Sequence, residues 1–251
     1  MPVYFIHSSQ VVDRRIVIED RLAHHLCSVL RIQKGETLFL VDERPKRYTG
    51  RVIESDRLRL MVEIVGEEDP PLFLRPFLHL GVGLLKGEKI DWVLQKATEL
   101  GAARISFLTT KRTVIQPKQE RAARQHDRWA GITLEAAQQS SRWTVPEVDP
   151  VLPLDDFLAV TAHYGLKFAF WEGAAAESLP MAIRSVLGAA PREGALLIGP
   201  EGGWEKGEVE AAGRAGFHPL SLGTTILRAE TAALAALAIL QYEIQRRSSG
   251  D

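Results

Sequence analysis

The fold of this chain is decided by residues 195–232, which read ALLIGPEGGW at 195–204 and PLSLGTTILRAETA at 219–232. Each of these two segments begins with a short apolar run typical of a buried strand and leads into a glycine loop. Residues 206–215 between them have a polar helical composition, and Gly216 follows where a helix C-cap favours glycine. The order strand, loop, helix, strand, loop, helix predicts a parallel α/β unit. We expect both loops at the carboxyl ends of parallel strands, where open α/β sheets bind ligands.

The second loop leads into a helix that has almost no polar face over residues 234–240. A helix that is apolar on all sides is buried, so charges at its start are costly unless they are paired or used. Arg228 and Glu230 are therefore candidate functional residues, and Glu201 of the first loop is a second candidate acid. Two plainer interpretations stay open: Glu230 caps the last helix, where the helix dipole favours a carboxylate, and Glu201 pairs with a basic residue.

Composition places the chain among ordinary globular proteins, with 251 residues, 45% of them hydrophobic and 25% charged. The net charge of −1 means that nucleic-acid binding would have to rest on local patches. The single cysteine excludes an intramolecular disulfide and indicates a reducing compartment. Residues 1–10 lack the pattern of a signal peptide, and the longest apolar run, 231–240, is too short to span a bilayer. We expect a cytoplasmic protein without a membrane partner.

Residues 1–70 predict a small β-barrel domain with strands at 3–6, 15–18, 37–41, 48–55 and 57–65. A helix at 21–30, with Asp20 as its N-cap, is expected to place one face on the barrel through Leu22, Leu26, Val29 and Leu30. His24 and Cys27 share a helical face, but a structural zinc site needs four ligands and no second pair exists, so we expect no metal. The acidic, proline-bearing segment 66–71 marks the boundary with a second domain, 71–251.

Residues 71–251 alternate between strand and helix patterns, which predicts a parallel sheet flanked by helices. The expected strands are 77–85, 105–108 and 167–171, and the expected helices are 88–100, 119–139, one starting at 155, and 179–187. The glycines of GVGLLKG at 81–87 are wrongly spaced for a dinucleotide fingerprint, which argues against a nucleotide-dependent dehydrogenase. The small and polar segment 135–142 is as consistent with lining a ligand site as with an ordinary helix end.

The loop motifs carry a family resemblance. GPEGGW at 199–204, LG at 222–223 and ILRAETA at 226–232 resemble the signature of the ribosomal RNA small subunit methyltransferase E family, whose members methylate N3 of one uridine in 16S ribosomal RNA. Further agreement comes from HH at 24–25, VLR at 29–31, KG at 86–87, KATELG at 96–101, EA at 135–136, QS at 139–140 and Arg142. Thr224 and Thr225 depart from the usual Pro-Arg of the family, so a basic residue expected beside the site is missing.

The resemblance implies a SPOUT-class α/β fold whose C-terminal parallel sheet contains a trefoil knot, preceded by a PUA-like β-barrel that binds RNA. It also implies a homodimer, S-adenosylmethionine as cofactor, no metal, and 16S ribosomal RNA or the 30S subunit as partner. Mapped onto this sequence, the cofactor-binding residues are Phe170, Trp171 and Glu172 of one loop, Ile198, Gly199, Gly202 and Gly203 of a second, and Leu222, Gly223, Ile226 and Leu227 of a third.

Methylation at N3 of uracil sets a chemical requirement, because that nitrogen carries a proton and is a poor nucleophile. A carboxylate, Glu230 or Glu201, could take the proton, and Arg228 could stabilise the resulting anion. The uridine has to be unpaired or flipped out, since base pairing would cover N3. Candidate contacts to RNA are Arg14, Arg15, Arg31, Lys86, Gln139 and Arg142.

Two alternatives stay open. One is another knotted methyltransferase that acts on transfer RNA or on a ribose 2′-hydroxyl, against which the LRAET string at 227–231 argues. The other is a non-catalytic RNA-binding assembly factor, favoured only by the departure at Thr224 and Thr225.

Overall fold

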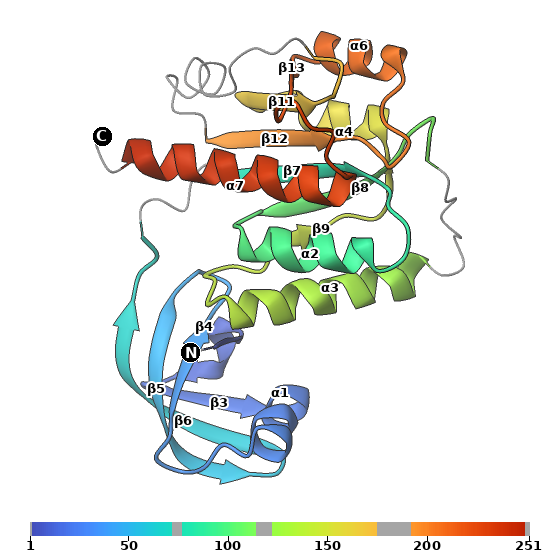
Figure 1. Ribbon diagram of the computed structural model, residues 1–251. Coiled ribbons are helices and arrows are strands. Elements are labelled where there is room, and N and C mark those ends of the chain that lie inside the picture. Colours follow the sequence, from blue (N-terminus) through green and yellow to red (C-terminus); the bar gives the residue numbers. More distant parts are fainter. Residues whose placement is uncertain (1, 72–76, 114–121, 175–191, 249–251) are drawn as a thin grey trace. The chain divides into compact units, whose positions relative to one another are not determined.

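The computed structural model describes residues 2–71, 77–113, 122–174 and 192–248 (Figure 1). The chain divides into two compact units. The N-terminal unit comprises Met1–Pro71 and Ala137–Thr144, and the C-terminal unit comprises Leu72–Ala136 and Val145–Asp251. The helix expected at 179–187 and the expected start of the 119–139 helix lie outside the described residues. Within the described ranges, no helix has the length and apolar character needed to cross a membrane.

The N-terminal unit is built on a six-stranded sheet with the order β1-β4-β5-β6-β3-β2. Its strands are β1 (Val3–Phe5), β2 (Val11–Val12), β3 (Arg15–Glu19), β4 (Thr37–Val41), β5 (Arg47–Asp56) and β6 (Arg59–Glu68), and a short helix η1 (Ser8–Gln10) joins the first two. The β1–β4 pairing is parallel and the other pairings are antiparallel. β6 begins later than expected because β5 extends to Asp56, which pairs with Arg59 across the hairpin turn.

Alternating side chains of this sheet form one hydrophobic core. In β3, for example, Ile16 and Ile18 are fully buried while Arg15 and Glu19 at its ends are exposed. This period of two is what the pleat of a half-buried strand requires. The expected strands of residues 1–70 are therefore present, with shifts of at most three residues at their ends.

The helix expected at 21–30 differs from the structure. An α-helix, α1 (Asp20–His24), widens into a π-helical turn, η2 (His25–Val29), closed by a bond of 3.0 Å from Leu30 N to His25 O. The extra residue in the turn rotates the following side chains, so Leu26 is buried but Val29 and Leu30 are exposed. Asp20 is not the N-cap: Glu19 occupies that position, and Asp20 has a positive φ of 59°.

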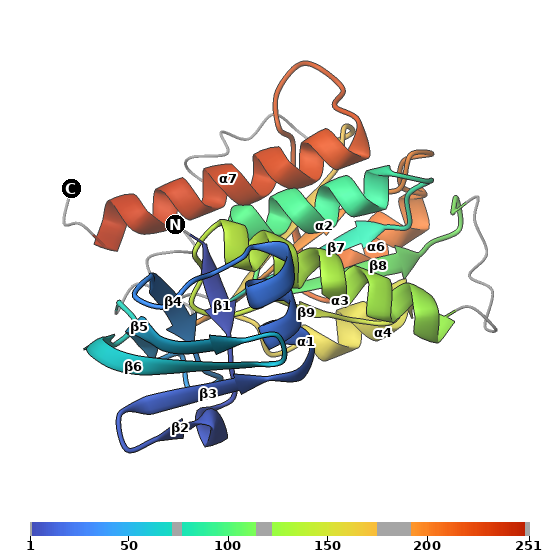
Figure 2. The same ribbon diagram turned by 90° about the horizontal axis from the view of Figure 1, so that it is seen from below.

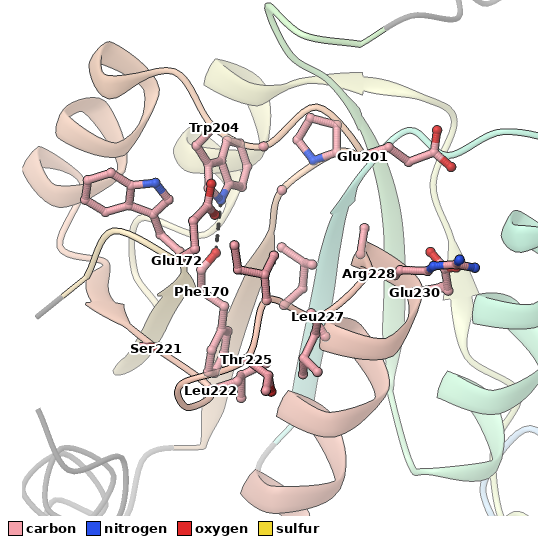
Figure 3. Close-up of a pocket in the computed structure, with 18 of the residues that line it drawn as sticks. Phe170, Glu172, Glu201, Trp204, Ser221, Leu222, Thr225, Leu227, Arg228 and Glu230 are labelled. Carbon is pink, nitrogen blue, oxygen red and sulfur yellow. Dashed lines mark hydrogen bonds between the residues drawn. The ribbon is translucent and has the colours of Figure 1, made fainter. Parts of the chain in front are cut away.

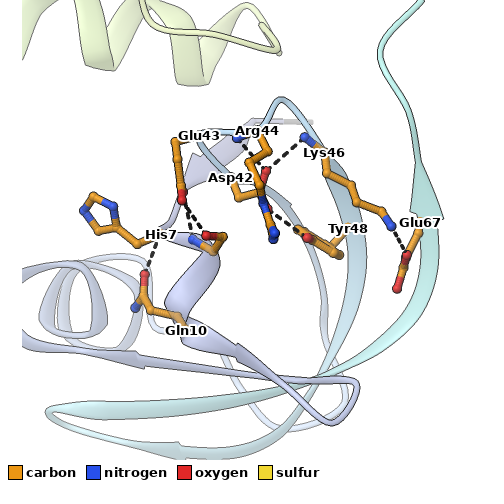
Figure 4. Close-up of polar contacts among 9 residues, drawn as sticks. His7, Gln10, Asp42, Glu43, Arg44, Lys46, Tyr48 and Glu67 are labelled. Atoms are coloured by element: carbon orange, nitrogen blue, oxygen red, sulfur yellow. Dashed lines mark hydrogen bonds and ion pairs between the residues drawn. The ribbon is translucent and has the colours of Figure 1, made fainter.

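The turn between β4 and β5 is organised by a buried carboxylate (Figure 4). Asp42 accepts hydrogen bonds from the main-chain amides of Arg44 (3.0 Å) and Lys46 (3.1 Å), and from the Tyr48 hydroxyl (2.9 Å). Burial opposes ionisation of this carboxyl, but these hydrogen bonds outweigh it and lower the pKa of Asp42. The turn expected from the sequence at 42–46 is thus fixed by local side-chain-to-backbone bonding.

The C-terminal unit confirms the expected parallel α/β sheet. The order is β10-β8-β7-β12-β11-β13, β9 also pairs with β8, and the pairings among these described strands are parallel. The strands are β7 (Phe77–Gly83), β8 (Arg104–Thr109), β9 (Glu147–Val148), β10 (Leu152–Pro153), β11 (Leu166–Phe170), β12 (Glu193–Ile198) and β13 (His218–Leu220). β12 lies between β7 and β11, so segments distant in sequence are neighbours at the centre of the sheet.

Helices cover both faces of this sheet (Figure 2). One face packs against α2 (Lys89–Glu99), α3 (Ala122–Gln139) and α7 (Ala229–Ser248), and the other against α4 (Leu154–Val160) and α6 (Lys206–Arg214). β12 shows the division clearly, because Leu196 and Ile198 join the first cluster while Ala195 and Leu197 join the second. The nearly all-apolar start of α7 is explained by its packing on α2, β7 and β12.

A buried polar cluster links β7, β8 and the segment after β9. Asp149 accepts hydrogen bonds from Ser106 Oγ and from Arg104 Nε, the latter at 2.9 Å. His79 Nε2 lies 2.6 Å from Ser106 Oγ, and the His79 side chain is fully buried. Burial is the main reason that the pKa of His79 is lowered. Burial disfavours the ionised form of Asp149, but hydrogen bonds from His79, Arg104 and Ser106 hold its pKa well below the ordinary value.

Candidate active site

Three loops leave the same edge of the parallel sheet. β12, β11 and β13 are adjacent and parallel, and they end at Ile198, Phe170 and Leu220. The loops that follow therefore lie together at the carboxyl edge, as the two glycine loops predicted. β13 ends at Leu220, whose carbonyl accepts a hydrogen bond from the Trp171 amide at 2.9 Å, and Ser221 Oγ then accepts one from the Gly223 amide in the following loop.

These loops enclose a pocket of about 640 Å³ (Figure 3), a volume typical of small-molecule sites. The pocket brings together every residue that the resemblance assigned to the cofactor, namely Phe170, Trp171, Glu172, Ile198, Gly199, Gly202, Gly203, Leu222, Gly223, Ile226 and Leu227. The three candidate catalytic residues, Glu201, Arg228 and Glu230, also line it. The geometry thus gathers these side chains in one place, while their individual roles stay predictions.

Hydrogen bonds between loops hold the pocket walls. The Trp204 indole Nε1 donates to Phe170 O at 3.1 Å, which joins the loop after β12 to the end of β11. Arg112, from the segment after β8, donates from Nη1 to Gly202 O at 3.0 Å. The sequence did not single out Arg112, and its contact becomes apparent only when β8 and β12 are placed in the same sheet.

Two positions in or beside the pocket loops require glycine, because neighbouring atoms lie too close for a Cβ. A Cβ at Gly83, the last residue of β7, would lie 2.4 Å from Pro200 N, so only glycine lets the loop after β12 pass this close. Gly203 has a φ of +71°, and its Cβ would lie 3.1 Å from Glu172 Oε1. Gly83, like Gly81 against the Phe157 ring, therefore serves packing, which agrees with rejecting a dinucleotide fingerprint there.

One end of the pocket is charged, and Figure 3 shows Glu201, Arg228 and Glu230 there. Lys89, the first residue of α2, lies 2.5 Å from Glu201 Oε1 and 3.6 Å from Glu230 Oε1. The hydrogen bond with Glu201 raises the pKa of Lys89, so its amine remains protonated. Glu230 is only 13% exposed, and its Oε2 is buried with no hydrogen-bond partner among the described residues. Glu201 thus has the basic partner that the plainer interpretation expected.

The sequence did not identify Lys89, although its position offered a signal. A lysine at the first position of a helix meets the positive end of the helix dipole, which disfavours a cation there. Thr224 and Thr225, where the family usually has Pro-Arg, line the pocket and are exposed. Ile226, in the same loop, is 84% exposed.

The six candidate RNA contacts lie outside the pocket lining. Arg14, Arg15, Arg31, Lys86 and Gln139 are exposed. Arg142 is less accessible, and burial lowers the pKa of its guanidinium to about 10, so it is still a cation at neutral pH. None of residues 135–142 lines the pocket, so the prediction that this segment lines a ligand site is not met at this pocket.

Metal ligands do not gather in the part of the chain that the structure describes: no group of three His, Cys, Asp or Glu side chains there could hold an ion. His24 is exposed, and the Cys27 thiol lies 3.5 Å from Ser55 Oγ.

Comparison with known proteins identifies both parts of the chain. The family model described as an RNA methyltransferase domain matches residues 74–241, and the model described as an RNA methyltransferase PUA domain matches residues 18–65.

Individual relatives agree with the family models. Ribosomal RNA small subunit methyltransferase E of Bacillus subtilis is 29% identical over 88% of this chain and 88% of its own length. The Synechocystis protein of the same name is 31% identical over 91% of this chain and 73% of its own. A crystal structure of the Neisseria gonorrhoeae protein of that name, bound to S-adenosyl methionine, is similar with a TM-score of 0.83 and 30% identity, covering 97% of this chain and 98% of that one. The chain therefore belongs to the ribosomal RNA small subunit methyltransferase E family.

Proposed function

We propose that this chain is an S-adenosylmethionine-dependent methyltransferase that modifies N3 of a uridine in 16S ribosomal RNA. The observation that carries this proposal is the pocket at the carboxyl edge of β11, β12 and β13, which combines the family's loop motifs with a charged end. The relatives named above supply the substrate class and the cofactor.

The pocket residues fit this cofactor. The Phe170, Ile198, Leu222 and Leu227 side chains and the main chain of three loops suit a purine nucleoside, which needs apolar contacts and main-chain hydrogen bonds. Glu172 adds a carboxylate that suits a ligand with a positive charge. The absence of a Cβ at Gly203 leaves the loop main chain open to close approach. When bound, S-adenosylmethionine supplies a methyl group on a sulfonium, and the electrons of the broken methyl–sulfur bond leave with the thioether.

Glu230 is the proposed proton acceptor. Its Oε2 is buried at the pocket and has no hydrogen-bond partner among the described residues, whereas Glu201 is held by Lys89 at 2.5 Å. The proton of uracil N3 passes to Glu230 Oε2, and the electron pair left on N3 forms the new bond to carbon. Arg228 stabilises the negative charge that spreads to the uracil oxygens, as a cation placed where charge develops does. Glu201 therefore serves to hold Lys89 rather than to take the proton.

We further propose the finer features that the family resemblance implies. These are a SPOUT-class trefoil knot formed by the C-terminal segment, and an RNA-binding, PUA-like barrel domain at 1–70 that precedes a methyltransferase domain at 71–251. They also include RNA contacts through Arg14, Arg15, Arg31, Lys86, Gln139 and Arg142, and a homodimer that acts in the cytoplasm without a metal. Loops from three adjacent strand ends and a C-terminal helix that follows the last loop support the knot.

A methyl-transfer assay tests the function directly. Labelled S-adenosylmethionine is incubated with 30S subunits, and separately with naked 16S RNA, both lacking 3-methyluridine, and the nucleosides are then analysed. We expect the label in 3-methyluridine. Label in a different nucleoside would move the chain to another RNA target, and no label without cofactor binding in calorimetry would leave an RNA-binding protein.

A further inference from the structure

Lys89 connects three separate elements at the charged end of the pocket. It begins α2, Glu201 follows β12, and Glu230 lies in the first turn of α7. Its ammonium group lies 2.5 Å from Glu201 Oε1 and 3.6 Å from Glu230 Oε1. One cation is therefore shared between two carboxylates that would otherwise repel each other across the pocket.

The position of Lys89 is unfavourable for its own helix. The first turn of a helix carries a partial positive charge, which stabilises carboxylates and destabilises ammonium groups. The α2 helix does not gain from this lysine, whereas Glu230 at the start of α7 does sit at a favourable helix end. The location of Lys89 is thus explained by the two carboxylates and not by α2.

The two contacts of Lys89 are unequal, and this inequality separates the roles of the carboxylates. Glu201 takes the short hydrogen bond, while Glu230 receives electrostatic support at one oxygen and keeps Oε2 unpaired. Arg228 is the other charged residue at this end of the pocket lining. The cluster of Lys89, Arg228, Glu201 and Glu230 is consequently charge-balanced before a substrate arrives.

We propose that Lys89 is a positioning residue that fixes the Glu230 carboxylate through Oε1 at the charged end of the pocket, with Glu201 as its anchor. This inference rests on the proposed function, because it assigns a purpose to Lys89 only if Glu230 takes a proton. Lys89 is not itself the proton acceptor, because its hydrogen bond to Glu201 raises its pKa and keeps it protonated. The proton moves from uracil N3 to Glu230 Oε2, and the proton count of Lys89 does not change.

The test compares Lys89→Met, Lys89→Arg and Lys96→Met with the wild-type chain. Lys96 also belongs to α2 but pairs with Glu99 of the same helix at 2.7 Å, so it serves as the matched control. For each protein, kcat and KM for 3-methyluridine formation on 30S subunits are measured at saturating cofactor. Cofactor Kd is measured by calorimetry, and Tm reports on folding.

For Lys89→Met we expect a kcat about 100-fold lower, as for a misplaced reacting group. We expect its KM for 30S subunits to stay close to the wild-type value, because the lost contact positions the proton acceptor and does not bind RNA. Lys89→Arg keeps the cation and should keep most of the wild-type kcat, and Lys96→Met should match the wild type in both kcat and KM.

The inference is overturned if Lys89→Met, folded and able to bind cofactor, keeps the wild-type kcat. It is also overturned if Lys89→Arg loses as much kcat as Lys89→Met, since the cation would then not be the cause. A wild-type chain that forms no 3-methyluridine overturns the proposed function itself, an outcome recognisable without any variant.

Discussion

Two charged clusters lie on the same parallel sheet and differ in how their carboxylates are hydrogen-bonded. In the buried cluster, both oxygens of Asp149 accept hydrogen bonds, Oδ1 from Arg104 and Oδ2 from Ser106. Arg104 also lies 3.6 Å from Glu147, and His79 Nδ1 has no partner among the described residues. At the pocket, one lysine meets two carboxylates, and an oxygen of Glu230 has no partner among the described residues. The buried cluster crosses β7 and β8 under α4, whereas the pocket cluster lies at the carboxyl edge of the sheet.

This difference separates a structural role from a chemical one. A buried polar group without a partner costs free energy, so a cluster that only supports the fold is expected to pair its charges. Glu230, a residue that lines the pocket, keeps such an unpaired oxygen next to a ligand site. We therefore expect changes in the buried cluster to alter stability, and changes at the pocket to alter catalysis.

The largest effect is expected at Glu230. Glu230→Gln removes the proposed proton acceptor while keeping the size of the side chain, and should lower kcat by roughly 10²- to 10⁴-fold. Single-turnover formation of 3-methyluridine on 30S subunits measures this rate. Glu210→Gln makes the same change on the exposed face of α6 and should leave kcat unaltered. Full activity of Glu230→Gln would place the acceptor elsewhere.

The next effect is on stability. Asp149→Asn removes the buried charge partner of Arg104, which keeps only the exposed Glu147, and should lower the free energy of unfolding by about 3 kcal/mol. Urea denaturation measures this loss, and calorimetry should find the cofactor Kd unchanged at 25 °C. Asp155→Asn, at the exposed start of α4, should cost less than about 1 kcal/mol. Weaker cofactor binding by folded Asp149→Asn would mean that the two clusters are coupled.

A smaller effect is expected from Gly203→Ala. The positive φ at this position disfavours a side chain by about 1–2 kcal/mol, and the new methyl group would crowd Glu172. The loop should therefore relax, and cofactor binding should weaken by roughly tenfold in calorimetry. Gly207→Ala in α6, where a Cβ meets no atom within 4 Å, is the matched control and should bind as the wild type does. Equal affinities would show that this loop conformation is not needed for binding.

The smallest effect concerns pH. Burial lowers the pKa of His79 in the folded chain, so the unfolded chain binds a proton first as the pH falls below about 6.5. The stability from neutral His79 is complete above that pH and decreases as the pH falls toward the folded pKa, by at most about 1.4 kcal/mol per pH unit. Urea denaturation at pH 7.5, 6.5 and 5.5 measures the slope, which His79→Gln should flatten. A slope unchanged in His79→Gln would assign the dependence to other groups.

The sequence predicted the alternating strands and helices of the C-terminal unit well, because each strand there is a short apolar run that ends at a polar or glycine-rich loop. It failed at residues 20–30. The π-helical turn at η2 inserts one residue into the helical repeat. Leu26 is therefore buried, whereas Val29 and Leu30, which the regular period placed on the same face, are exposed. Such a shift depends on how the segment packs against the sheet. The 3.6-residue spacing of apolar residues in the sequence carries no information about that packing.

The pocket could be predicted because its residues are clustered in three loop motifs. Lys89 and Arg112 could not, because each acts on a loop about a hundred positions away in sequence, and a single lysine or arginine at a helix start or strand end resembles an ordinary surface charge. Their contacts follow from the strand order, in which β12 inserts beside β7.

The indole of Trp204 has a further consequence. It is almost fully buried, donates to Phe170 O, and forms part of the pocket wall together with Trp171, so two of the five tryptophans of the chain lie where the cofactor is proposed to bind. Indole fluorescence responds to polarity and to nearby stacked rings. The protein therefore carries an intrinsic optical probe of pocket occupancy, and titration with unlabelled cofactor can be followed by tryptophan emission without attaching a dye.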